Sequence, residues 1–280
     1  MVPILFFDKK KVKAQKQINH MKMNNPWRIV DRVIHESDIL LEVIDARMPN
    51  RTRNRKVENK IRRKRKFLIL VINKSDLITR RMRMDFLRNF ESREVIFVSC
   101  KDRIGISSLK KMIFNLARTI RYRDYVRVGV VGYPNTGKSS LINVLVGFKS
   151  VAKTSPIAGF TTGIQWIKGK GDIMFLDTPG VIPFGENDET EQALMSAIDP
   201  NKLVNSDLAA MKIIQLFLDH DKKVLEKFYD VKIETGDTFE ILLQIGKRRN
   251  LLRKGGKVDE VRTALTVIRD WQSGNLLLNL

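Results

Sequence analysis

Cysteine, histidine and long apolar runs are all scarce in this sequence. The single cysteine, Cys100, excludes an internal disulfide and fits a reducing compartment. The three histidines, His20, His35 and His220, lie far apart along the chain and suggest no metal-binding cluster. No apolar stretch approaches the length that is needed to span a bilayer. We therefore expect a cytoplasmic protein that makes no contact with membranes.

Acidic residues are also few relative to basic ones. The chain has 31 Asp and Glu against 52 Lys and Arg, which gives a formal net charge of +21. The excess is concentrated in residues 9–22, 51–66 and 247–257 rather than spread evenly. Such clustering favours a polyanionic partner, with RNA, DNA and an anionic membrane as the candidates. A generally basic, solvated surface is the alternative.

Strand and helix patterns divide the chain into two parts. Up to about residue 183, short apolar runs typical of buried strands alternate with amphipathic stretches, which predicts an α/β domain with helices on both faces of a sheet. From 187 to 273 only helical periods occur, which predicts a smaller all-α domain. The expected organisation is a basic N-terminal arm at 1–25, an α/β domain at 26–184 and a helical domain at 185–280.

A phosphate-binding motif lies near the middle of the chain. Residues 132–139 read Gly-Tyr-Pro-Asn-Thr-Gly-Lys-Ser and fit G-x-x-x-x-G-K-[ST], with a strand pattern before and a helix pattern after. Backbone N–H groups of such a loop surround phosphate oxygens, and the helix N-terminus adds a positive dipole end. Lys138 is expected to reach the β- and γ-phosphates, and Ser139 to bind Mg²⁺. The predicted nucleotide-binding residues are Asn135, Thr136, Gly137, Lys138, Ser139 and Ser140; the alternative is a glycine-rich turn that binds nothing.

A tetrad that suits a guanine base ends an earlier apolar run. Residues 67–72 read as a buried strand, and Asn73, Lys74, Ser75 and Asp76 follow it. The Asp76 carboxylate can accept hydrogen bonds from guanine N1–H and N2–H₂, a pair that adenine does not offer. Asn73 can bond the base edge and brace the phosphate loop, and the Lys74 stem can lie across the purine. The tetrad alone is a weak signal, but its place at the end of a strand strengthens it.

A second loop supports the guanine reading. Ser99, Cys100 and Lys101 also end a strand pattern and resemble the S-A-K loop of GTPases, whose middle backbone N–H meets guanine O6. Cys100 takes the alanine position, where a small residue is sufficient. A buried small hydrophobic residue is the alternative reading of Cys100, and it is compatible with this role.

Two further motifs follow the phosphate loop. Residues 177–180 read Asp-Thr-Pro-Gly after a strand pattern, as in the D-x-x-G motif of GTPases. Asp177 is expected to hold Mg²⁺ through water, and the Gly180 N–H to sense the γ-phosphate. Between the two motifs, residues 158–163 resemble a switch-I segment, in which Thr161 is the preferred Mg²⁺-binding threonine and Thr162 stays an alternative.

The order of these elements is unusual. The base-reading tetrad and the S-A-K-like loop precede the phosphate loop, switch I and D-x-x-G, whereas the phosphate loop comes first in an ordinary GTPase. We therefore predict a P-loop GTPase domain that is circularly permuted, followed by the small all-α domain. Termini of compact domains often lie close together, so such a permutation is physically easy.

A sequence with these motifs in this order resembles the circularly permuted ribosome-assembly GTPases of the RbgA/YlqF-like group. The resemblance extends from about residue 20 to the C-terminus. Residues 45–49, Asp-Ala-Arg-Met-Pro, are similar to that family's D-A-R-x-P signature, and residues 250–276 are similar to its tail. The resemblance implies GTP hydrolysis to GDP, with rRNA of the immature large ribosomal subunit as partner and a monomer away from it. The implied RNA-binding residues are Lys247, Arg248, Arg249, Arg253, Lys254 and Lys257.

The resemblance also bears on catalysis. Val181 stands directly after D-x-x-G, where Ras-like enzymes have the glutamine that orients the attacking water. Slow intrinsic hydrolysis is therefore expected, with Lys138, Asn135 and Thr161 as the catalytic candidates. Asn135 resembles the asparagine that helps hold an activating K⁺ in potassium-dependent relatives, which would add K⁺ to GTP/GDP and Mg²⁺; turn chemistry is the equal alternative for this residue.

Three competing functions remain open from the sequence. The first is a GTPase that acts on another RNA, such as tRNA or the small subunit. The second is a GTP-dependent RNA-binding scaffold with negligible catalysis, for which Val181 is the best argument. The third is a P-loop ATPase or kinase, which Asp76 disfavours.

Overall fold

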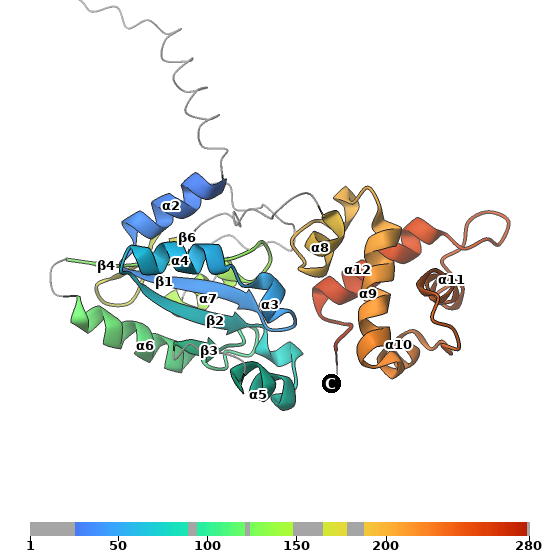
Figure 1. Cartoon of the computed structure of the whole chain (residues 1–280), viewed down its shortest axis with the longest axis horizontal. Coiled ribbons are helices and arrows are strands. Elements are labelled where there is room, and N and C mark those ends of the chain that lie inside the picture. Colours follow the sequence, from blue (N-terminus) through green and yellow to red (C-terminus); the bar gives the residue numbers. More distant parts are fainter. Residues whose placement is uncertain (1–25, 89–93, 121–123, 148–164, 178–187, 279–280) are drawn as a thin grey trace, which may run out of the picture.

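A computed structural model describes residues 26–88, 94–120, 124–147, 165–177 and 188–278. It has two parts, a helix-covered sheet and a group of helices beside it (Figure 1). This confirms the predicted α/β domain followed by an all-α domain. Within the described ranges, no helix is both long and apolar enough to cross a membrane.

Within the described residues, the sheet has six strands in the order β3-β2-β1-β4-β6-β5. Neighbouring strands run parallel, except that β5 and β6 pair antiparallel. All residues of the central strand β1 are buried, which explains its almost continuous apolar sequence. The strands span Ile39–Asp45 (β1), Phe67–Asn73 (β2), Val95–Phe97 (β3), Val126–Val131 (β4), Gln165–Lys168 (β5) and Ile173–Asp177 (β6).

Helices cover both faces of this sheet and alternate strand residues fill two cores. Leu41 and Val43 belong to the core on the side of α6 and α7, whereas Leu40 and Ile44 belong to the core on the side of α2 and α4. The helices are α2 (Pro26–Glu36), α3 (Pro49–Thr52), α4 (Arg55–Arg63), η1 (Ser75–Leu77), α5 (Arg80–Arg88), α6 (Ile106–Thr119) and α7 (Lys138–Val146). The two-sided packing is typical of a parallel sheet.

The carboxyl ends of the parallel strands meet at one edge. There β1 ends at Asp45, β2 at Asn73, β4 at Val131 and β6 at Asp177. Asp45 and Asn73 are register partners on neighbouring strands. Ligands of open α/β sheets bind outside this edge, so the strand ends define where a site should lie.

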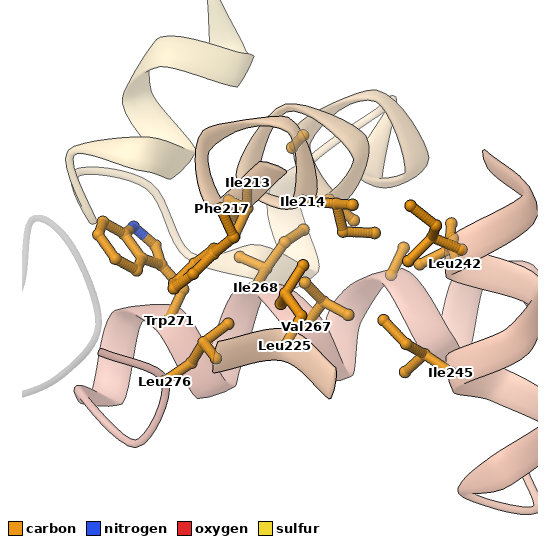
Figure 2. Close-up of a cluster of buried hydrophobic side chains, with 14 of the residues drawn as sticks. Ile213, Ile214, Phe217, Leu225, Leu242, Ile245, Val267, Ile268, Trp271 and Leu276 are labelled. Carbon is orange, nitrogen blue, oxygen red and sulfur yellow. The ribbon is translucent and has the colours of Figure 1, made fainter. Parts of the chain in front are cut away.

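The helical domain, α8 to α12, packs around the long helix α9 (Ser206–His220). In its core, the rings of Phe217 and Trp271 meet edge to face at 5.9 Å between centroids, and both side chains are fully buried (Figure 2). An aspartate caps the start of most of these helices; Asp237, for example, accepts hydrogen bonds from two backbone N–H groups of α11. The other elements are α8 (Glu189–Leu194), η2 (Pro200–Lys202), α10 (Lys222–Tyr229), α11 (Thr238–Arg248) and α12 (Glu260–Ser273).

Candidate nucleotide-binding site

The predicted phosphate loop connects β4 to the N-terminus of α7. Neither of the two glycines in this loop has room for a side chain. A Cβ on Gly132 would lie 2.5 Å from the Val43 carbonyl oxygen, and a Cβ on Gly137 would lie 2.2 Å from the Asn73 Nδ2. Gly137 also has φ +98°, a conformation that L side chains rarely adopt. The two glycines therefore let the loop close tightly over the strand ends.

Asn73 of the tetrad holds two loops together. Its Nδ2 donates a 2.8 Å hydrogen bond to the Thr136 carbonyl in the phosphate loop. Its Oδ1 accepts a 3.3 Å bond from the Cys100 backbone N–H. The predicted brace between the tetrad and the phosphate loop is thus present in the structure. This Cys100 N–H is also the group that we expect to meet guanine O6.

The lysine of the phosphate loop points back into the loop. The Lys138 Nζ donates to the Tyr133 carbonyl at 2.8 Å, and the side chain is buried. The Thr136 hydroxyl donates to the same carbonyl at 2.9 Å. Ser139 and Ser140 follow in the first turn of α7 and are half-buried. The positive end of α7 and the Lys138 ammonium therefore lie together, an arrangement that favours an anion.

The base-reading end of the site lies at the end of β2. Lys74 adopts a left-handed conformation with φ +61°, and the chain turns there into η1, which carries Ser75 and Asp76. The buried Ser75 N–H donates to the Val98 carbonyl at 3.1 Å, which ties η1 to the Ser99–Lys101 loop. Asp76 is half-buried. Burial, followed by the charge of Asp76, raises the pKa of the Cys100 thiol to about 12, so this cysteine stays neutral.

Several predicted residues are placed only in part. Asp177 ends β6, next to the strand that leads into the phosphate loop. The switch-I threonines Thr161 and Thr162, together with Gly180 and Val181, lie outside the described residues.

Asp45 and Arg47, which the sequence suggested only as part of a family signature, form a buried ion pair next to the tetrad. Both side chains are buried, and Arg47 donates to Asp45 through Nε at 3.1 Å and Nη2 at 2.8 Å. The Lys74 ammonium donates to the same carboxylate at 2.7 Å. Burial raises the pKa of Asp45, but the two cations outweigh it and hold that pKa well below its ordinary value. In the sequence, the feature that could have indicated this pair was an acidic residue at the end of a buried strand.

The six predicted RNA-binding residues lie at the end of α11 and in the loop before α12, and all are exposed. Three of them have partners within the protein. Arg248 pairs with Asp230, Arg253 pairs with Asp259, and the Arg249 guanidinium lies over the Tyr229 ring at 5.3 Å. The other three residues, Lys247, Lys254 and Lys257, form no ion pair with a carboxylate of a described residue.

Comparison with known proteins finds similar GTP-binding proteins. A family model described as 50S ribosome-binding GTPase matches residues 127–244, which begin in β4 and include the phosphate loop. An uncharacterized GTP-binding protein of Methanocaldococcus jannaschii is 40% identical over 252 residues, which cover 89% of this chain and 65% of that protein. Nucleolar GTP-binding protein 2 of Pneumocystis carinii is 31% identical over 256 residues, with 89% and 52% covered. The chain thus spans less than two thirds of either relative.

Solved structures support the fold. GNP-bound YlqF from T. maritima matches with a TM-score of 0.57 and 21% identity, covering 95% of both chains. GDP-bound YlqF matches with a TM-score of 0.60 and 23% identity, covering 89% of this chain and 95% of the other. In the present sheet, β1 to β3 and the base-reading tetrad precede the phosphate-loop strand β4, as a permuted order requires. The chain therefore has the fold of YlqF, with a P-loop GTPase domain in circularly permuted order, and over 89% of its length it is similar in sequence to GTP-binding proteins.

Proposed function

We propose that this chain binds GTP and hydrolyses it slowly to GDP. One observation carries the proposal: Asn73 joins the base-reading tetrad to the phosphate loop at the carboxyl edge of the sheet. A nucleotide bound there would have its phosphates at the start of α7 and its base near Asp76. The Asp76 carboxylate supplies the acceptor pair that selects guanine over adenine.

Mg²⁺ fits the donors that the proposed site offers. Hard oxygen ligands suit this ion, and Ser139 at the start of α7 and Asp177 at the end of β6 provide them from neighbouring elements. We propose these two residues, with Thr161, as the protein's share of the magnesium site. When bound, Mg²⁺ neutralises charge on the β- and γ-phosphates. The chain's own contribution is to position the phosphates and to present the Lys138 ammonium to them.

Slow hydrolysis is proposed from the residue that follows the D-x-x-G motif. Val181 has no group that can orient water, so the free chain should turn over poorly. A bound RNA surface or a K⁺ ion could supply the missing function. A GTP-dependent scaffold with no catalysis is the alternative that Val181 supports.

The proposed partner is rRNA of an assembling large ribosomal subunit. The matching family model carries a 50S ribosome-binding description, and a relative is named as nucleolar. This chain adds the exposed lysines of the α11–α12 loop and a second basic surface on α4. On that helix Arg55, Lys56, Arg62 and Arg63 are exposed, while Val57 and Ile61 face the sheet. Phosphate contacts of this kind give affinity without reading base sequence.

Nucleotide competition tests the proposal. Labelled GDP should be displaced by unlabelled GTP and GDP but not by ATP, and Lys138→Ala should abolish binding. Single-turnover GTP hydrolysis is then measured with and without large ribosomal subunits. Stimulation by the particle supports a GTPase acting there. Binding without hydrolysis under either condition leaves only the scaffold, and equal displacement by ATP contradicts the guanine assignment.

A further inference from the structure

Arg47 follows β1 in the sheet domain but makes most of its remaining contacts with the helical domain. Its Nη1 donates to the Trp271 carbonyl in α12, and its Nη2 donates to the Ser196 hydroxyl after α8 at 3.2 Å. Its guanidinium also lies over the Trp271 ring, 4.7 Å from the ring centroid. Figure 1 shows α8 and α12 facing the end of the sheet that carries α3. One buried guanidinium therefore holds the helical domain against the strand ends.

The charge that balances Arg47 is shared with the base-reading tetrad. Asp45 accepts from both Arg47 and the Lys74 ammonium, and both cations contact Oδ2, at 2.8 and 2.7 Å. Lys74 belongs to the loop that would contact the purine. Any change in how strongly Arg47 neutralises Asp45 must alter how strongly Asp45 holds Lys74, because the two cations compete for one carboxylate.

Two further contacts connect the helical domain to the site. The Asn135 amide in the phosphate loop donates to the Ser196 carbonyl at 2.7 Å. Gly274, at the end of α12, lies against η1, since a Cβ added there would be 3.0 Å from the Leu77 Cδ1. Asp76 directly precedes Leu77. The helical domain thus contacts both nucleotide loops while Arg47 connects it to Lys74.

We propose that Asp45 and Arg47 are positioning residues that couple guanine-nucleotide binding to docking of the helical domain. With the domain docked, Trp271 and Ser196 hold the Arg47 guanidinium in place beside Asp45, and the carboxylate that Arg47 shares anchors the Lys74 ammonium next to the base-reading loop. With the domain undocked, the guanidinium loses its contacts to Trp271 and Ser196, so the charge balance at Asp45 changes and with it the position of Lys74. This inference rests on the GTP binding proposed above, and the coupling must be reciprocal.

Burial decides which interdomain contact carries the coupling. Removing one partner of a buried ion pair leaves an uncompensated charge, which is strongly unfavourable. Arg51 also pairs across the boundary, with Glu191, but its side chain is 46% exposed. An exposed pair of this kind contributes little. Arg51→Gln is therefore a matched control for Arg47→Gln.

The test uses Trp271 as a reporter of docking. Trp27→Phe and Trp166→Phe leave it as the single tryptophan, with Arg47 over its ring. GDP and ADP affinities and Trp271 emission are measured in this background for the parent, Arg47→Gln, the milder Arg47→Lys, and Arg51→Gln. Circular dichroism confirms that each variant is folded. We expect GDP to change Trp271 emission in the parent and in Arg51→Gln.

Arg47→Gln should weaken GDP binding at least fivefold and reduce the emission change, with a smaller loss in Arg47→Lys; Arg51→Gln should bind like the parent. A parent that binds GDP with no change in Trp271 emission overturns the coupling. So do folded Arg47 variants with parental GDP affinity, because a purely structural arginine would alter thermal stability alone. If the parent binds no guanine nucleotide, the proposed GTP binding itself is wrong. This outcome differs from one in which GDP binds but the coupling is absent.

Discussion

The Asn73 side chain donates its 2.8 Å hydrogen bond to the Thr136 carbonyl across 63 positions of sequence. This contact joins a loop that would read the base to a loop that would hold the phosphates. Permutation has reversed the order of the two loops in the chain but not their relation in space. The parallel strands β1, β2 and β4 make this possible, since their carboxyl ends meet at one edge.

Gly137 should be essential for nucleotide binding. In Gly137→Ala the new methyl group would lie 2.2 Å from the Asn73 Nδ2 at a backbone φ of +98°, so the loop must open. We expect GDP affinity to fall by about tenfold or more, the equivalent of about 1.4 kcal/mol. Gly147→Ala is the control, because Gly147 also has a positive φ, +84°, but nothing lies within 4 Å of the added Cβ. Equal GDP affinities in the two variants, measured by calorimetry, would contradict this account of the loop.

Glu42 should make stability depend on pH. It is fully buried in β1; its Oε1 accepts from the Asn54 N–H at 2.6 Å, and among the described residues Oε2 has no hydrogen-bond partner. Burial, with a smaller contribution from Glu58, raises its pKa from 4.5 to about 8. The protonated acid is therefore the stable folded form. Its stabilising contribution is complete below pH 4.5 and is lost as pH rises through 8.

Glu42→Gln, which imitates the protonated acid, tests this effect. Relative to the variant, the parent should lose roughly 1.4 kcal/mol of unfolding free energy per pH unit between about pH 5 and pH 8, and little more above that. Denaturant unfolding at several pH values measures it. Glu94→Gln removes an exposed carboxylate and serves as control. Parent and Glu42→Gln curves that stay parallel from pH 5 to 9 would show that Glu42 is ionised in the fold.

Asn135 offers a choice between two roles. If it helps to hold K⁺, GTP hydrolysis should be faster in KCl than in NaCl at matched ionic strength, and Asn135→Gly should remove the difference. Glycine suits the test because Asn135 has φ +56°, which glycine adopts without strain. If the residue serves only to contact the Ser196 carbonyl, the variant should change thermal stability and leave the KCl to NaCl ratio as in the parent.

The α11–α12 loop should contribute to RNA affinity through charge. Replacing Lys247, Lys254 and Lys257 with Gln removes up to three phosphate contacts. The slope of log affinity against log salt should then fall by roughly two to three for large-subunit rRNA. Lys110 and Lys111 in α6, with Lys170 between β5 and β6, form a control set with the same charge change. Filter binding across a salt series measures both sets; identical slopes would remove this loop from the interface.

The sequence predicted the residues of the nucleotide site better than the interdomain contacts that hold them in place. The phosphate loop and the Asn73–Asp76 tetrad were recognisable because each depends on local spacing at the end of a strand. The Arg47–Trp271 contact joins residues 224 positions apart, and no local pattern pairs them. Likewise, the sequence suggested ion binding or a turn for Asn135, whereas the structure shows its amide on Ser196. Contacts of this kind depend on how the cores of the two domains pack together.

Base selectivity of the Asp76→Asn variant tests the central claim most directly. The asparagine amide offers one acceptor where the carboxylate offers two, and it adds a donor that suits the second carbonyl of xanthine. Affinities for GDP and for xanthosine diphosphate are measured side by side in the parent and the variant. The account predicts that GDP binding weakens at least tenfold while xanthosine diphosphate binding becomes stronger than in the parent. Unchanged GDP affinity in a folded Asp76→Asn protein would show that this permuted tetrad does not read guanine.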